Sequence, residues 1–196
     1  MTLAELIVEV YTITGRADRV AETLSAVRSA TLKAHQSDFY AKDLVENIIA
    51  FNTAEFVQNL DYRALLSRWR ALKYIRKYNI TSGTPGKFLS TVVPENVMDK
   101  YAIQQQDICY IAGQFLQINS STQEQYYILG NYLNPDITEV GYSSWVALDH
   151  PYAIVYDAAA TVFKAIGKDE ESSAMRSLVQ EQYADIKISS LSTTGF

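Results

Sequence analysis

Few residues in this chain have the types and spacing that chemistry needs. The stretch "SGTPGKF" at 82–88 has the composition of a phosphate-binding loop, with two glycines and a lysine. A Walker loop, however, needs glycines five positions apart and a serine or threonine directly after the lysine, so that backbone amides surround the phosphates and the hydroxyl binds the metal. Here Gly83 and Gly86 are three positions apart, and Phe88 follows Lys87. The stretch therefore favours a plain surface turn.

Metal-binding and nucleophilic residues are equally scarce. His35 ends a predicted helix and His150 precedes a proline at a predicted helix start, and neither has neighbours of the ligand type. Cys109 is the sole cysteine, and its apolar surroundings are typical of a buried, inert thiol. The acidic run 169–171 is typical of the charged first turn of a helix. G-x-S-x-G and H-E-x-x-H motifs are absent. We therefore predict no catalytic residue, no cofactor, no metal and no enzymatic activity.

One cluster of positive charge lies between residues 63 and 77. Its segment, "RALLSRWRALKYIRK", interleaves six cations with Trp69 and Tyr74. Three interpretations stay open: stacking and phosphate contacts with a nucleic acid, a solvated and salt-bridged face, or a patch that docks an acidic protein surface through Arg and Trp anchors. The cations are Arg63, Arg68, Arg70, Lys73, Arg76 and Lys77. A partner interface here would use Arg63, Arg68, Trp69, Arg70 and Arg76.

Composition narrows the class of protein. With 196 residues, 48% of them hydrophobic and 20% charged, the chain can bury a substantial core. Its formal net charge is −5, whereas proteins that gain affinity by neutralising phosphates carry the opposite balance. The N-terminus has no signal-peptide pattern, and no apolar run reaches the roughly 18 residues of a membrane span. We expect a soluble protein, cytoplasmic when synthesised, without membrane contact.

Helical periodicity predicts a helical hairpin at the N-terminal end. Thr2 and Glu5 have the spacing of a capping box, and Gly15 marks the end of the first helix. A second helix is expected from about Asp18 to about His35.

A second helical hairpin is predicted over roughly 151–187. Pro151 suits the first helical position, apolar residues recur at three and four, and the alanine run 158–160 allows close packing of helices. The polar ending, residues 190–196, is predicted to be a flexible tail whose apolar anchors are Leu191 and Phe196. The alternative for this tail is a frayed terminus without a function.

The middle of the chain, at about 41–133, is predicted to be rich in β-structure. Residues 41–59 suit one or two strands, while the segment from Trp69 suits a strand or, almost as well, a helix. "DICYIAGQFLQINSS" predicts a hairpin that turns near Gly113. The predicted fold class is thus α+β and predominantly helical, with a single domain at 1–189 and a tail at 190–196.

The order of these segments resembles the head-to-tail adaptor proteins of tailed double-stranded DNA bacteriophages. The resemblance rests on "AVRSATLKAHQSDFYAKDL", "LDYRALLSRWRALKYIR", "YIAGQFLQI" and "YSSWVALDHPYAIVYDAAATVFKAIGKDEE". It implies a structural virion protein without catalytic residues, located in the neck between head and tail and in the host cytoplasm during assembly. Twelve copies would form a ring below the portal protein, extend the DNA channel and dock a tail or nozzle protein. Genomic DNA would pass through this channel without specific binding.

The competing class is a small helical nucleic-acid-binding or regulatory protein. Such a protein needs a helix-turn-helix with a basic recognition helix, whereas the two predicted helical hairpins carry few cations on an exposed face.

Overall fold

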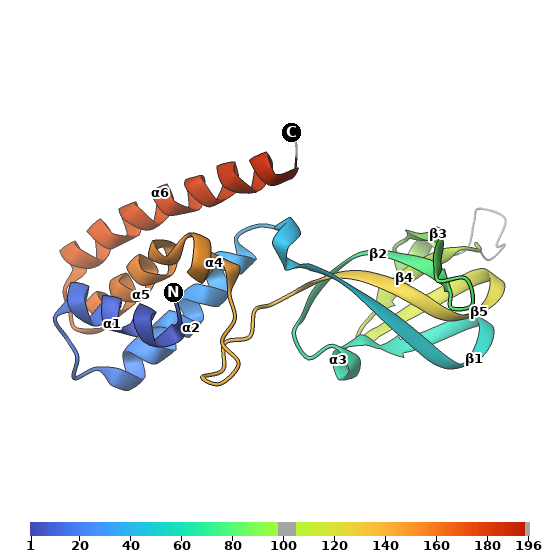
Figure 1. The fold of residues 1–196 in the computed structure, drawn as a ribbon, viewed down its shortest axis with the longest axis horizontal. Coiled ribbons are helices and arrows are strands. Elements are labelled where there is room, and N and C mark those ends of the chain that lie inside the picture. The colour runs from blue at the N-terminus through green and yellow to red at the C-terminus, as the bar shows by residue number, and fades with distance from the viewer. Residues whose placement is uncertain (98–104, 195–196) are drawn as a thin grey trace. The chain divides into compact units, whose positions relative to one another are not determined.

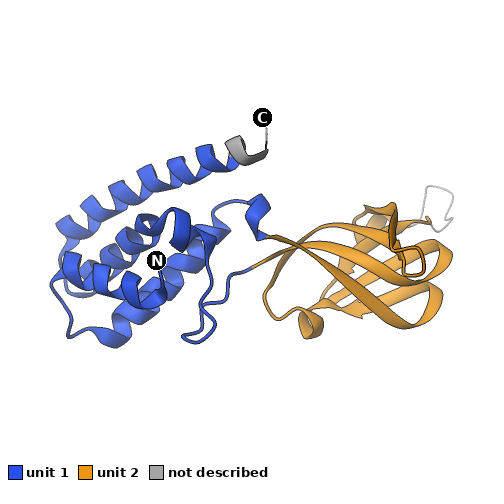
Figure 2. Cartoon of the chain, viewed as in Figure 1, with its two compact units in different colours: residues 1–43, 134–196 blue, residues 44–133 orange. Residues whose placement is uncertain are grey.

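The chain divides into two compact units. The computed structural model describes residues 1–97 and 105–194, and the side chains up to residue 190. The helical unit comprises 1–43 and 134–196, and the β unit comprises 44–133 (Figure 2). The β unit is thus an insertion in the sequence of the helical unit. Where the sequence predicted one domain with a β-rich middle, that middle forms a compact unit of its own.

The prediction of a predominantly helical fold is wrong. About 44% of the structure is helical and 34% is strand, with a closed four-stranded β-barrel. The difference comes from two long strands, β1 (Leu44–Asp61, 18 residues) and β5 (Phe115–Leu133, 19 residues). The ambiguous segment is also a strand, β2 (Trp69–Asn79). A short apolar pattern can suit either a helix or a strand. Burial against the neighbouring strands makes this segment a strand.

The helical unit contains the predicted hairpins (Figure 1). Thr2 and Glu5 form the capping box, in which the Thr2 N–H donates to Glu5 Oε2 at 2.8 Å and the Glu5 N–H donates to Thr2 Oγ1 at 3.3 Å. Gly15 ends the first helix in the left-handed conformation, with φ of 65°. The elements are α1 (Leu3–Thr14), α2 (Val20–Gln36), a 3-10 turn (Ala41–Asp43), α4 (Trp145–Asp149), α5 (Pro151–Ala165) and α6 (Asp169–Thr194).

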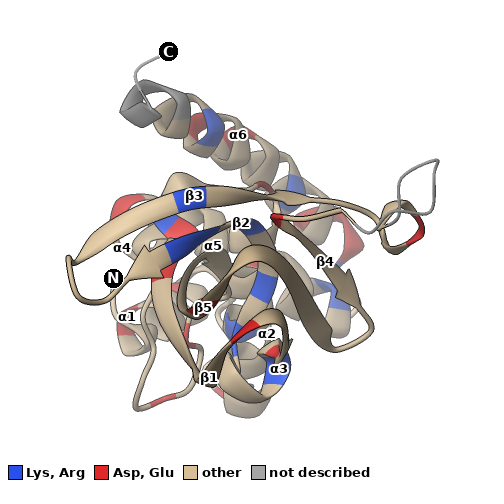
Figure 3. Cartoon of the chain, turned by 90° about the vertical axis from the view of Figure 1, so that its right-hand side faces the viewer, with Lys and Arg blue, Asp and Glu red and all other residues tan. Residues whose placement is uncertain are grey.

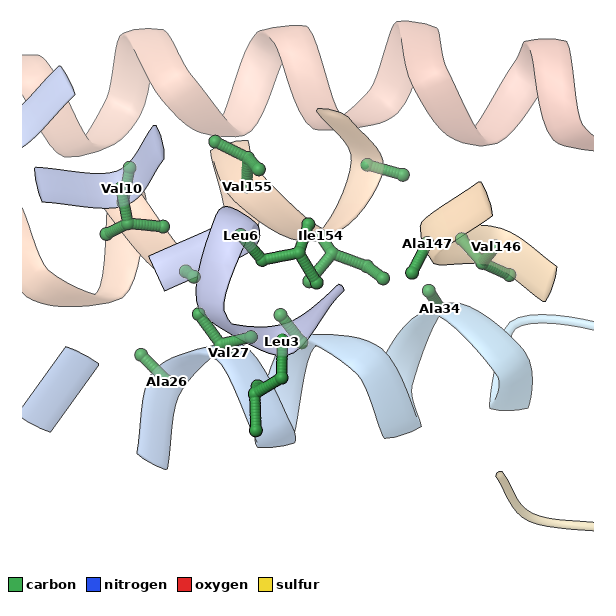
Figure 4. Close-up of a cluster of buried hydrophobic side chains, with 14 of the residues drawn as sticks. Leu3, Leu6, Val10, Ala26, Val27, Ala34, Val146, Ala147, Ile154 and Val155 are labelled. Carbon is green, nitrogen blue, oxygen red and sulfur yellow. The ribbon is translucent and has the colours of Figure 1, made fainter. Parts of the chain in front are cut away.

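Helix α5 forms the centre of this unit, because it packs against α1, α2, α4 and α6. Leu6 of α1 lies beside Ile154 of α5 (Figure 4), and Val10 of α1 and Val27 of α2 belong to the same buried core. Ala159 is 0% exposed in the same core. The small side chains of 158–160 therefore lie where neighbouring helices approach closely, as predicted. Within residues 1–97 and 105–194, no helix combines the length and the apolar content that crossing a membrane requires.

Helix α6 is longer than predicted. It continues through Thr194, so residues 190–194, expected as the start of a flexible tail, are helical. The stretch contains no glycine or proline before Gly195, and the fully buried Ile186 ties the helix to the core. Leu191 lies in this last part of α6, and Phe196 lies outside the described residues.

The β unit closes four strands into a barrel. The remaining strands are β3 (Thr84–Thr91) and β4 (Ile108–Ala112), with a 3-10 turn at Pro94–Asn96 and a short helix α3 at Tyr62–Leu65. The order is β1-β5-β2-β3-β4, and β4 also pairs with β5, so that β5, β2, β3 and β4 form a closed ring of strands. Only the β3–β4 pair is parallel among the described strands.

The sequence predicted two turns of the β unit, and both contain a glycine. Gly113 has φ of 62°, and Ala112 pairs with Phe115, which confirms the predicted hairpin between β4 and β5. Gly83 has φ of 66° in the turn between β2 and β3. The surface turn predicted at 82–88 is therefore shorter, because residues from Thr84 onward pair with β2 as strand β3.

Candidate functional site: a basic docking surface

The structure separates the six cations of residues 63–77. Strand alternation along β2 buries Lys77, whose Nζ lies 2.8 Å from Asp107 Oδ1. Arg76 lies on another face of the strand, with Nη2 2.9 Å from Glu46 Oε1 of β1. Lys73 is exposed, and its Nζ lies 5.8 Å from the centroid of the Tyr132 ring. Arg76 and Lys77 are thus both in ion pairs, but Lys77 is buried and does not belong to a solvated face.

The remaining arginines gather around α3 and the start of β2. A hollow of about 330 Å³, here called the basic hollow, opens between these two elements. Arg63 and Arg70 supply its charge, and Arg68 is exposed in the segment that joins α3 to β2. Figure 3 shows the positive charge on α3 and on β2. The lining residues are Tyr62, Arg63, Leu66, Ser67, Trp69 and Arg70.

Local contacts hold the basic hollow in shape. Asp61 caps α3, because its Oδ1 accepts hydrogen bonds from the Arg63 and Ala64 N–H groups at 3.1 Å. The Tyr62 ring lies against Trp69, with centroids 4.6 Å apart and an interplanar angle of 34°. The Tyr62 hydroxyl donates to the Gly113 carbonyl at 3.2 Å. An aromatic pair anchored in this way gives the arginines a firm apolar wall.

The electrostatics of the hollow favour an anionic partner. Arg63 and Arg68 are exposed, and within residues 1–97 and 105–194 neither has a carboxylate at ion-pair distance. A guanidinium beside an aromatic ring can bind a carboxylate or a phosphate through two parallel hydrogen bonds. Of the predicted interface residues, the structure thus brings together Arg63, Trp69 and Arg70, keeps Arg68 nearby, and places Arg76 against Glu46 instead.

Sequence reasoning missed a second constellation, formed by Ser144, His35 and Asp43. His35 Nδ1 lies 2.7 Å from Asp43 Oδ1, and His35 Nε2 lies 2.8 Å from Ser144 Oγ. The Trp145 indole N–H also donates to Asp43 Oδ1 at 2.7 Å. Ser144 lies 109 positions from His35 along the chain, so no spacing rule could connect the two. The sequence had placed His35 only at the end of a predicted helix.

This constellation has the connectivity of a Ser-His-Asp relay, but its surroundings are those of a structural clamp. All three residues are buried, and Ser144 Oγ also accepts a hydrogen bond from the Ala147 N–H at 3.2 Å as the cap of α4. The network joins the end of α2, the turn at 41–43 and the start of α4. It therefore anchors the segment that leads into β1 to the core of the helical unit.

The described part of the chain also bears on a metal site and a reactive thiol. Within it, no three His, Cys, Asp or Glu side chains lie together in a way that could hold a metal ion. Cys109 is buried, and burial raises the pKa of its thiol. No protein-family model matches the sequence, and no curated protein matches it either.

Proposed function

We propose that this chain is a structural virion protein: a head-to-tail adaptor that forms a ring below the portal, extends the DNA channel and docks the tail. The observation that supports it best is the outer edge of β1. Within the described residues, this 18-residue strand pairs with β5 alone, so its other edge presents unpaired backbone groups. Large apolar side chains are exposed along it, namely Val45, Ile48, Phe56 and Val57.

Such an edge is suited to pairing with another chain, although β1 has register irregularities between Ala50 and Val57 and the charge of Glu46. Monomeric proteins protect long edge strands with charges, bulges or covering elements, because open edges pair with other chains. Large apolar side chains that are exposed along an edge strand would also be covered by a neighbouring subunit. Lateral contacts in a ring would cover both features of β1. The edge of β1 supports assembly with other chains. The resemblance to adaptor proteins supports the neck of a phage as the location of this assembly.

The charge of the two units suits a DNA conduit. The helical unit carries 15 acidic and nine basic residues and the β unit seven and eight, so that their net charges are −6 and +1. A surface with few net cations lets DNA slide past, since phosphates find little to bind.

A second candidate function is nucleic-acid binding by a regulatory protein. The observation that favours it is the basic hollow, where Trp69 could stack on a base and Arg63 could bind a phosphate. We rank it second because the cations of residues 63–77 include two that are already paired, Arg76 and Lys77.

The test mixes the purified chain with portal rings of the same phage and examines the product by electron microscopy. We expect added density of twelvefold symmetry beneath the portal. Ile48→Asp combined with Phe56→Asp should weaken this assembly, because both side chains are about half exposed on β1. Val140→Asp, a fully exposed position outside β1, is the matched control and should assemble normally. Portal rings that retain no wild-type chain would contradict the proposal.

A further inference from the structure

We propose that the basic hollow of one copy receives the acidic first turn of helix α6 from a second copy of this chain. The inference rests on the proposed ring-forming function and names the lateral contact within that ring. It combines two features without an ion-pair partner among the described residues: exposed arginines on the β unit and exposed carboxylates on the helical unit.

The hollow provides the receiving surface. Arg63 and Arg68 lack a carboxylate partner within residues 1–97 and 105–194, and the tilted ring pair of Tyr62 and Trp69 forms an apolar wall of the hollow that Arg63 lines. Arginine with tryptophan and tyrosine is the composition that dominates binding energy at protein interfaces. A planar guanidinium is suited to carboxylates.

The first turn of α6 provides the ligand. Asp169 and Glu170 are adjacent and exposed, and neither forms an ion pair among the described residues. Glu171 differs, because Lys168 Nζ lies 3.4 Å from its Oε1. Two neighbouring free carboxylates therefore face solvent on the unit whose net charge is −6, while the hollow belongs to the unit whose net charge is +1.

Complementary patches at different places on one chain produce a particular kind of assembly. When surface A of one copy binds surface B of the next, the contact is heterologous, and it closes into a ring if the rotation allows. Exposed ion pairs are individually weak and screened by salt. The contact is thus expected to be weak between two free copies, and to strengthen when several copies are held side by side.

The test uses two neutralised variants of the full chain. The first, Arg63→Gln with Arg68→Gln, loses the receiving charges; the second, Asp169→Asn with Glu170→Gln, loses the acidic turn. Sedimentation velocity at low ionic strength and rising concentration should show association of the wild type. In each variant alone the association constant should fall about tenfold or more, because the charge complementarity is lost.

An equimolar mixture of the two variants gives the sharpest result. The first variant keeps its acidic turn and the second keeps its hollow, so only one of the two possible contacts can form. The mixture should therefore stop at dimers, whereas the wild type grows larger. Glu181→Gln with Asp185→Asn removes two acidic charges elsewhere on α6, and Arg176→Gln removes a cation there; both controls should associate like the wild type.

Several outcomes would overturn the inference. These are a wild type that stays monomeric at low ionic strength, variants that associate as strongly as the wild type, or a mixture that grows beyond dimers. Retention of short duplex DNA by the wild type, lost in the arginine variant, would assign the hollow to nucleic acid instead. Because no portal is present, failure here leaves the portal-binding test of the proposed function standing on its own result.

Discussion

The ammonium group of Lys77 lies 2.8 Å from the Asp107 carboxylate inside the β unit, and each side chain is only 11% exposed. Lys87 Nζ lies 2.8 Å from the other oxygen of Asp107. The Ser121 N–H and hydroxyl both donate to Asp107 Oδ1 at 2.9 Å. This carboxylate thus connects β2, β3 and β5, and it should contribute to holding the barrel closed.

Replacing Asp107 by Asn should destabilise the β unit by about 3–5 kcal/mol, because the buried Lys77 charge loses its partner. Asn is the suitable substitution, since Asp107 has φ of 56° and Asn tolerates the left-handed conformation. Denaturant unfolding followed by circular dichroism measures the loss. Glu95→Gln, at an exposed position of the same unit, should leave the midpoint unchanged. Equal midpoints for both variants would contradict the importance of the pair.

The same group predicts how stability depends on pH. Burial alone would raise the pKa of Asp107, but hydrogen bonds from Lys77, Lys87 and Ser121 outweigh burial and hold this pKa well below its usual value. A carboxyl with a depressed folded pKa contributes its full stability above the unfolded pKa of about 4, and loses that contribution as the pH falls further. The contribution of Asp107 to the free energy of unfolding should therefore be constant near neutral pH and decrease below about pH 4. Asp107→Asn should show a shallower fall between pH 4 and 2 than the wild type does.

Ala159→Leu should destabilise the helical unit by about 1–3 kcal/mol, because the position is fully buried where α5 meets its neighbours. Thermal unfolding gives the measurement. Ala165→Leu is the matched control, since Ala165 is exposed at the end of the same helix. A transition temperature for Ala159→Leu equal to that of the control would mean that the space around α5 is not closely packed.

Ser144→Ala should cost about 1–3 kcal/mol of stability, because it removes both the cap of α4 and the hydrogen-bond partner of His35 Nε2. Ser143→Ala tests the adjacent but exposed hydroxyl and should be close to neutral. Trp145 shares Asp43 with His35, so its fluorescence should shift in Ser144→Ala and stay constant in Ser143→Ala. A variant with unaltered stability and fluorescence would contradict the clamp.

Duplex DNA should bind weakly or not at all at physiological salt, because a chain of net charge −5 neutralises few phosphates. A gel-shift titration at rising ionic strength measures this directly. Sub-micromolar retention of DNA at physiological salt would contradict the conduit and favour a nucleic-acid-binding regulator.

The sequence alone determined the features that depend on residues close together along the chain. The capping box at Thr2, the helix end at Gly15 and the hairpin turn at Gly113 each depend on residues within a few positions of one another. The helical hairpins follow equally from apolar spacing along a single segment. A backbone hydrogen bond to a near neighbour, or a φ that only glycine adopts easily, needs no knowledge of the rest of the chain.

The tertiary structure decided what depends on distant partners. Trp69–Asn79 is a strand because β5 and β3 pair with it, and the pattern of its own side chains suited a helix almost as well. The same pairing divides the cations, burying Lys77 beside Asp107 while leaving Arg63 exposed. His35 meets Ser144 across 109 positions of sequence. Strand register and helix packing bring such residues together. The free energy that stabilises these contacts comes from burying surface between distant segments, which no local sequence pattern reveals.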